Sequence, residues 1–340
     1  MEAWRRALNG DPLPWLLEEE TPAVRHLTLR RLLDEPDDAP AVRRARAAAM
    51  RSHPIAPILA AQDPEGWWVK PGHGYAPKYT GTVWSLIFLD QLGADGRDPR
   101  VERACRYVLS HTQAEIGGFA ASGNKAEDRP PPGSGAIHCL NGNLLRATIG
   151  FGWLDDPRVR RSIDWQARSI TGEGFDAYYR SGTSGPGFAC AANEHEPCAW
   201  GAIKALLGLA AIPPRRRAAP VRRAVAAGAE FLLSRDPAVA DYPMGWGNTK
   251  PSGSWFKLGF PSGYVADALQ NLEVLCELGH GRDPRLANAI ELVASMQDGD
   301  GRWVNRYAYN GKTWGNIERQ GAPSKWVTLR ACAVLRRGLG

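Results

Sequence analysis

Three of the six cysteines lie in short polar or glycine-rich stretches instead of on the apolar face of a helix. They are Cys139 in Ile137-His138-Cys139-Leu140, Cys190 in Gly187-Phe188-Ala189-Cys190, and Cys198 in Glu194-His195-Glu196-Pro197-Cys198. Three thiolates with one histidine form a common zinc ligand set. We therefore expect Cys139, Cys190, Cys198 and His195 to bind zinc, with His138 as the alternative fourth ligand.

Two other interpretations of these thiols stay open. They could line a cavity without binding metal, or Cys190 and Cys198 could form a redox-active pair. The seven residues between these two cysteines match no standard zinc motif, so the fold has to bring the ligands together. The remaining thiols fall at apolar helical positions, where a buried cysteine behaves as a small hydrophobic group: Cys105, Cys276 and Cys332.

A second group of polar residues lies at or near the start of other apolar segments. Its members are Asp267, Lys78, Tyr79, Lys325 and Glu318, and we expect them to be the catalytic groups. A charged carboxylate inside an apolar helix is costly unless it is paired. Asp267 should therefore face the cavity as an acid or base, or pair with Lys78, Lys325 or an arginine.

The helices that position these residues are predicted from a repeated sequence segment. The segments Asp98-Pro99-Arg100, Asp156-Pro157-Arg158 and Asp283-Pro284-Arg285 each precede apolar residues at helical spacing. Aspartate suits the N-cap of a helix, and proline suits its first turn because the missing N–H would have no partner there. Each segment therefore predicts the start of an amphipathic helix, and a period of about 60 residues indicates a repeat architecture.

Between these amphipathic helices lie segments that are apolar on most sides, which predicts helices buried on most sides. They are residues 82–93, 140–152, 199–208, 264–279 and 326–338, with a first member at 23–33. Alternation of outer and inner helices in about six pairs predicts an α/α toroid spanning residues 1–340 as a single domain. In such a ring the starts of successive inner helices meet at one mouth, which would gather the thiols.

A second repeated signature reads Gln, three residues, Gly, one residue and an aromatic side chain. It occurs at Gln62 to Trp68, Gln113 to Phe119 and Gln297 to Trp303. Glycine permits a tight turn, the aromatic ring fills the space between repeats, and the Gln amide can bond to the end of a neighbouring helix.

This signature resembles the QW repeats of the terpene cyclase and protein prenyltransferase superfamily, including squalene–hopene cyclases. The resemblance is strongest over residues 55–340, whereas the first helix pair in residues 1–54 is divergent. It implies a toroid with an apolar cavity and an apolar, isoprenoid substrate. Prenyltransferases of this superfamily also hold a catalytic zinc at the barrel mouth, with Asp, Cys and His as ligands.

The acidic motifs of the cyclases are missing, since the chain contains neither Asp-x-Asp-Asp nor Asp-Asp-x-x-Asp. The leading hypothesis is therefore a zinc-dependent transferase, lyase or cyclase acting on an apolar substrate. The alternative is a non-catalytic binding or scaffold protein with a structural zinc. A less favoured third hypothesis is a membrane-surface cyclase with a substituted acid.

Composition limits the partners that we expect. The net charge of +6 comes from scattered arginines, with local clusters at 215–217 and 222–223 and no interleaved aromatic residues, so we expect no nucleic acid partner. No stretch approaches 18 apolar residues, so we expect no transmembrane segment, while peripheral membrane contact stays open. The N-terminus lacks an apolar leader, so we expect a cytoplasmic protein with reduced thiols.

Overall fold

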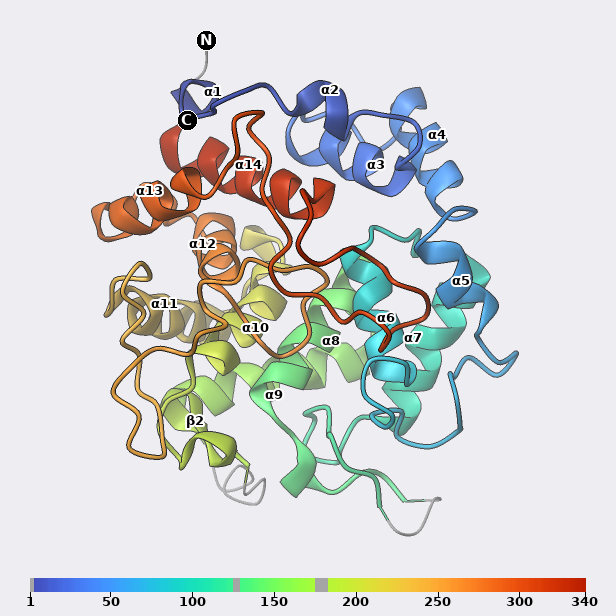
Figure 1. Ribbon diagram of the computed structural model, residues 1–340. Coiled ribbons are helices and arrows are strands. Elements are labelled where there is room, and N and C mark those ends of the chain that lie inside the picture. The colour runs from blue at the N-terminus through green and yellow to red at the C-terminus, as the bar shows by residue number, and fades with distance from the viewer. Residues whose placement is uncertain (1–2, 125–128, 175–182) are drawn as a thin grey trace.

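Six largely apolar helices form the inner ring of an α/α toroid, as the sequence predicts (Figure 1). The computed structural model describes residues 3–124, 129–174 and 183–340. The inner helices are α3 (Pro22–Arg31), α6 (Thr82–Gln91), α8 (His138–Gly150), α10 (Ala199–Ala210), α12 (Ala268–Glu277) and α14 (Lys325–Leu339). Because each packs on its neighbours and on outer helices, few of their side chains reach solvent.

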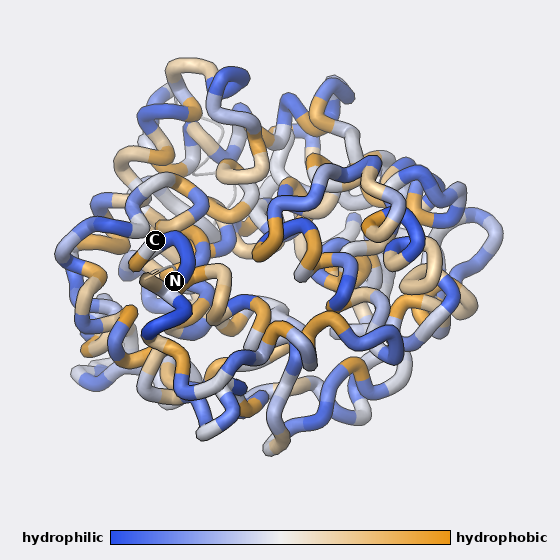
Figure 2. The backbone as a smooth tube through the Cα atoms, turned by 90° about the horizontal axis from the view of Figure 1, so that it is seen from above, coloured by the Kyte–Doolittle hydropathy of each residue, from blue (hydrophilic) through white to orange (hydrophobic). Residues whose placement is uncertain are grey.

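The outer layer consists of helices that pack against the inner ring. They are α4 (Pro40–Ala49), α5 (Ile55–Ala60), α7 (Pro99–His111), α9 (Pro157–Thr171), α11 (Ala219–Leu233) and α13 (Ala287–Ser295). Short helices α1 (Ala3–Arg6) and α2 (Leu13–Leu16) pack on α14, which also packs on α3, so the ring closes where the two ends of the chain meet. Figure 2, viewed from above, shows the termini side by side.

The remaining regular structure is short. Strands β1 (Ser184–Gly185) and β2 (Ala189–Cys190) pair antiparallel, with Ser184 opposite Cys190. The 3₁₀ turns are η1 (Gly133–Gly135), η2 (Pro186–Phe188), η3 (Ala191–Asn193), η4 (Pro214–Arg216) and η5 (Pro284–Leu286). Within the part of the chain that the structure describes, none of the helices combines the length and apolar character needed to cross a bilayer.

The predicted aspartate caps are present. The carboxylates of Asp98, Asp156 and Asp283 each accept a hydrogen bond from the backbone N–H two residues later, at 2.9, 2.8 and 3.0 Å. Each also pairs with the guanidinium of that same arginine. The third copy begins with the turn η5 before α13 continues it. Asp-Pro-Arg is therefore a cap whose aspartate and arginine also form an ion pair.

The Gln–Gly–aromatic signature connects neighbouring repeats. In its three copies the Gln side-chain amide donates to a backbone carbonyl at the next outer position: Gln62 to Arg100 at 2.9 Å, Gln113 to Arg158 at 2.7 Å and Gln297 to Ala7 at 2.9 Å. The glycines have left-handed φ values and the aromatic rings are fully buried. The third copy reaches the N-terminal segment, so it helps to close the ring.

Helices α8 and α10 cross with almost no space between their backbones. A Cβ atom at Gly142 would lie 2.1 Å from the Lys204 carbonyl oxygen, and one at Gly208 would lie 2.6 Å from the Gly142 carbonyl oxygen. This crossing matters for function because Cys139 lies at the start of α8 and Cys198 caps α10.

The predicted helix boundaries differ most from the structure at the start of the fifth inner helix. The fifth inner helix begins at Ala268 instead of residue 264, because the Asp267 carboxylate accepts from the Gln270 N–H at 2.8 Å and caps the helix. The segment from Phe260 to Tyr264 is thereby free to enter the ring.

Candidate functional site

A cavity of about 470 Å³, which we call the mouth cavity, opens at the starts of α8 and α10. Its wall is largely apolar and aromatic, with rings from Tyr75, Phe188, Trp200, Tyr242, Trp255 and Tyr264. Trp246 lies at its rim with 71% of its surface exposed. The volume is within the range of small-molecule sites, and the lining suits an apolar ligand.

The three predicted thiols all line this cavity. Cys139 comes from the first turn of α8, Cys190 ends strand β2, and Cys198 caps α10. Backbone hydrogen bonds hold the last two segments together, from Cys190 N–H to the Glu196 carbonyl at 3.2 Å and from Cys198 N–H to the Phe188 carbonyl at 2.9 Å. The fold therefore gathers on one wall side chains that are up to 59 residues apart in the sequence.

The three thiols differ in acidity. Interaction with the neighbouring Cys198 thiol and with the backbone N–H groups of Ala192 and Asn193 lowers the pKa of Cys190 to about 6, although burial opposes this. The same contact and burial raise the pKa of Cys198. Burial raises the pKa of Cys139 to about 12. Of the three thiols, Cys190 therefore has the lowered pKa, whereas those of Cys139 and Cys198 are raised.

The two histidines do not complete a ligand set. His195 is exposed in the turn before Cys198 and does not line the mouth cavity. His138 does line it, but its Nε2 lies 3.0 Å from the Gly185 carbonyl and its Nδ1 lies 2.9 Å from the Gln166 amide. Burial lowers the pKa of His138 to about 4, so its ring is neutral.

A zinc site of the predicted composition therefore does not fit the side chains as they stand. In residues 3–124, 129–174 and 183–340, no group of three or more His, Cys, Asp or Glu side chains has the arrangement of a metal site. Zinc binding stays a prediction.

The five predicted catalytic residues are not brought together. Lys78 is exposed on the rim of the mouth cavity. Tyr79 packs against Trp84 and Tyr309, with ring centroids 5.1 and 4.2 Å away. Burial raises the pKa of Tyr79.

Lys325 and Glu318 lie elsewhere, in a cavity of about 390 Å³ where α14 meets α2 and α3. The Lys325 ammonium bonds to the Glu18 carboxylate at 2.6 Å and to the Thr21 hydroxyl at 2.9 Å. The Glu318 carboxylate accepts from Ser324, the cap of α14, at 2.8 Å. The contacts of Lys325 therefore help to close the ring, whereas Glu318 supports the cap of α14.

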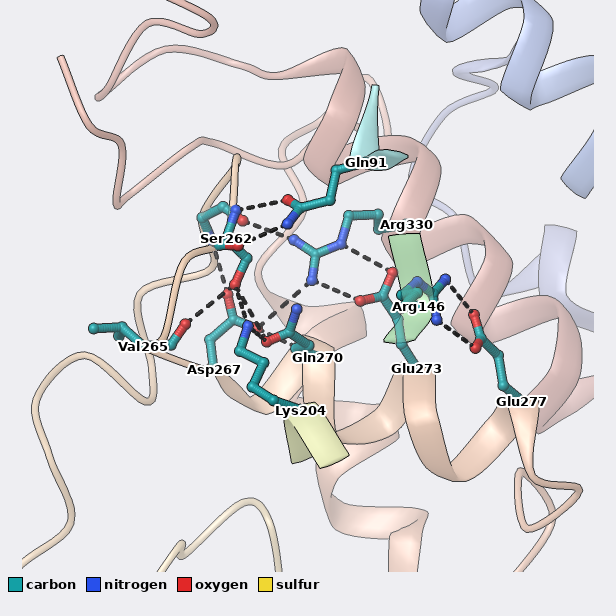
Figure 3. A network of polar contacts seen from close by, with 11 residues as sticks. Gln91, Arg146, Lys204, Ser262, Val265, Asp267, Gln270, Glu273, Glu277 and Arg330 are labelled. Atoms are coloured by element: carbon teal, nitrogen blue, oxygen red, sulfur yellow. Dashed lines mark hydrogen bonds and ion pairs between the residues drawn. The ribbon is translucent and has the colours of Figure 1, made fainter. Parts of the chain in front are cut away.

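Asp267 belongs to a buried polar network inside the ring (Figure 3). Besides capping α12, it accepts from the Gly259 N–H at 2.9 Å and lies 4.0 Å from the Arg330 guanidinium. Its partner is thus an arginine, one of the alternatives that the sequence left open. Burial raises the pKa of Asp267 in spite of this neighbour.

Sequence reasoning missed Lys204, which is fully buried in the middle of α10. Its ammonium donates to the Ser262 hydroxyl at 2.8 Å and to the Gln270 side-chain oxygen (Figure 3). Burial lowers the pKa of Lys204 to about 7. The sequence feature that could have predicted it is a single lysine within an otherwise apolar helix.

Comparisons with known proteins do not identify the activity of this chain. No family model and no curated protein matches the chain. A solved unsaturated glucuronyl hydrolase specific for heparin has a TM-score of 0.49 at 11% identity, covering 94% of this chain and 85% of its own. A GH76 α-mannanase from Bacteroides thetaiotaomicron has a TM-score of 0.42 at 10% identity, covering 99% and 86%.

A type II terpene cyclase from Scytonema, solved with merosterolic acid A, has a TM-score of 0.32 at 12% identity, covering 84% of this chain and 94% of its own. The three solved proteins act on different kinds of substrate. A shared architecture does not assign a reaction, so function has to be derived from the site itself.

Proposed function

We propose that this chain is an enzyme that binds an apolar, isoprenoid-like substrate in the mouth cavity and that the Cys190 sulfur reacts with it. The observation that carries the proposal is an apolar cavity lined by both Cys190 and Cys198, in which the neighbouring Cys198 thiol lowers the pKa of Cys190. The isoprenoid assignment rests on the sequence resemblance and on the aromatic lining.

The arrangement of Cys190 suits nucleophilic chemistry. Donors aimed at a sulfur stabilise the thiolate, which is the reactive form. Addition of this thiolate to an electron-poor carbon of the substrate forms a C–S bond and moves the electron pair of the double bond onto the neighbouring carbon. Cys198, which keeps its proton because its pKa is raised, can transfer that proton to the carbanion. When the double bond is conjugated to a carbonyl group, rotation about the C–C single bond of the adduct before the reverse steps releases the geometric isomer and restores the Cys190 thiolate and the Cys198 thiol.

The test compares two maleimides, one with an ethyl group and one with a ten-carbon chain. We expect the long-chain reagent to label Cys190 faster, because its tail enters the mouth cavity, and we expect added farnesol to slow this labelling. Peptide mass spectrometry identifies the labelled residue, with Cys190→Ser as the blank and the buried thiol of Cys105 as an internal control. Equal rates for both reagents without protection by farnesol would contradict the proposal.

A second candidate is a non-catalytic binding protein in which a metal ion joins the three cysteine segments. The observation in its favour is that Cys139, Cys190 and Cys198 line one wall and influence one another electrostatically. Three thiolates would leave a fourth zinc position for water or another ligand. Elemental analysis, described in the Discussion, separates the two candidates.

A further inference from the structure

A second cavity, of about 70 Å³, lies inside the ring and is here called the axial cavity. Every inner helix contributes to its wall: Arg31, Asp90, Arg146, Leu207, Glu273 and Arg330 come from α3, α6, α8, α10, α12 and α14 in turn. The segment that precedes α12 separates it from the mouth cavity, since Phe260 and Ser262 line the axial cavity whereas Tyr264 lines the other.

Two of its three guanidinium groups have carboxylate partners (Figure 3). Arg146 holds Glu277 through two contacts of 2.8 and 3.1 Å. Arg330 holds Glu273 through contacts of 2.9 and 2.6 Å and also donates to the Gly259 carbonyl at 2.7 Å. Paired in this way, both arginines are satisfied within the protein.

Arg31 is different. Within the part of the chain that is described, its guanidinium has no hydrogen-bond acceptor and no carboxylate within 4.0 Å. Burial, together with the charge of Arg146, lowers the pKa of Arg31. The Arg31 side chain is partly exposed and lines the axial cavity, so its N–H groups are available to a water or an ion there.

Asp90 lines the same cavity from α6, the next inner helix. The nearest cation to its carboxylate in the described residues is Arg146, 3.9 Å away, and no protein hydrogen bond reaches it there. Neighbouring polar groups bond to one another instead, as Gln91 and Ser262 do through two contacts of 2.7 and 2.8 Å. The axial cavity is thus bounded by one guanidinium and one carboxyl group that both lack a partner.

We propose that the axial cavity binds a small oxyanion, of the size of hydrogen carbonate or phosphate, between Arg31 and Asp90. The oxygens of such an ion accept from the Arg31 N–H groups, and a protonated Asp90 donates to it. Burial raises the pKa of Asp90, which favours the protonated carboxyl group. One water needs roughly 10–15 Å³ of such space, so about 70 Å³ holds an ion of four or five heavy atoms and excludes an isoprenoid chain.

The test is calorimetric titration of the purified protein with sodium phosphate and, separately, with sodium hydrogen carbonate at constant ionic strength. We expect Arg31→Gln to weaken binding at least about tenfold, the effect of losing one charge-assisted hydrogen bond. Asp90→Asn should keep the binding, because its amide donates where the protonated carboxyl group does. The matched control is Arg25→Gln on the same helix, whose arginine bonds to Leu17 and Glu19 away from the cavity.

A crystal soaked in selenate provides a second measurement that does not depend on the variants folding. We expect an anomalous peak in the axial cavity next to Arg31. An empty or water-filled cavity in that crystal, or binding that is the same in Arg31→Gln as in the parent protein, would overturn the proposal.

Discussion

Replacing Lys204 with methionine tests whether keeping the charged lysine inside the ring lowers the free energy of unfolding. The side chain is fully buried, and its ammonium bonds to Ser262 and Gln270. The titratable groups that act on it are Asp267, Arg330, Cys139 and Glu273. Methionine has a similar length and no charge, so it fills the same space without the desolvation penalty.

The magnitude follows from the lowered pKa. A fall from 10.5 to about 7, at about 1.36 kcal/mol per pH unit, corresponds to a cost of about 5 kcal/mol for keeping the amine charged in the folded state. The folded value lies below the unfolded one, so between these two pH values the unfolded chain binds more protons and stability rises with pH. Raising the pH from 6 to 9 should therefore stabilise the parent protein by roughly 3 kcal/mol through the titration of Lys204 alone.

The loss of the two hydrogen bonds in Lys204→Met costs roughly 1–3 kcal/mol at either pH. We therefore expect the variant to be more stable than the parent at pH 6 and nearly equal to it at pH 9. Urea unfolding at both pH values measures this, with the exposed lysine variant Lys312→Met as the control. A stability difference that does not change with pH would refute the reasoning, because it would mean that Asp267 keeps Lys204 charged throughout.

Three further predictions concern the helix crossing and the thiols. Gly142→Ala should lower the unfolding free energy by roughly 3 kcal/mol or more, because the new methyl group would clash with the backbone of α10. Gly228→Ala should cost less than about 1 kcal/mol, because its methyl group would contact only the Leu206 side chain. The rate of Cys190 alkylation should rise with pH around a midpoint below ~8.5, the pKa of a free cysteine. The variant Cys198→Ser should move that midpoint upwards. An unchanged midpoint would contradict the interaction between the two thiols. Elemental analysis should find little zinc and full Cys190 reactivity after chelation, whereas about one zinc per chain that is lost in Cys139→Ser would favour the metal-joined binding protein.

The architecture was predictable because its signals are local and repeated. Asp98, Asp156 and Asp283 cap helices through hydrogen bonds that span two residues, so a tripeptide is enough to predict them. The periodicity of apolar residues likewise separates inner from outer helices. The gathering of the cysteines on one wall follows from the closed ring, because successive inner helices begin at the same mouth.

The ionic state of the side chains was not predictable from their neighbours in sequence. Asp267 lies next to a helix start like the other caps, yet only the ring places Arg330 beside it. Lys325 and Glu318 were expected at the catalytic mouth, but Lys325 bonds to Glu18 across the seam where the two ends of the chain meet, and Glu318 bonds to the nearby Ser324.

The sequence alone therefore determined the repeat, the helix boundaries to within a few residues and the set of candidate thiols, since these depend on short-range hydrogen bonds and periodic burial. Only the tertiary structure decided which thiol is acidified, where Lys204 finds its partners and that Arg31 faces a cavity without one. Such properties depend on desolvation and on charges that the fold brings together from distant segments, so a short stretch of sequence cannot predict them.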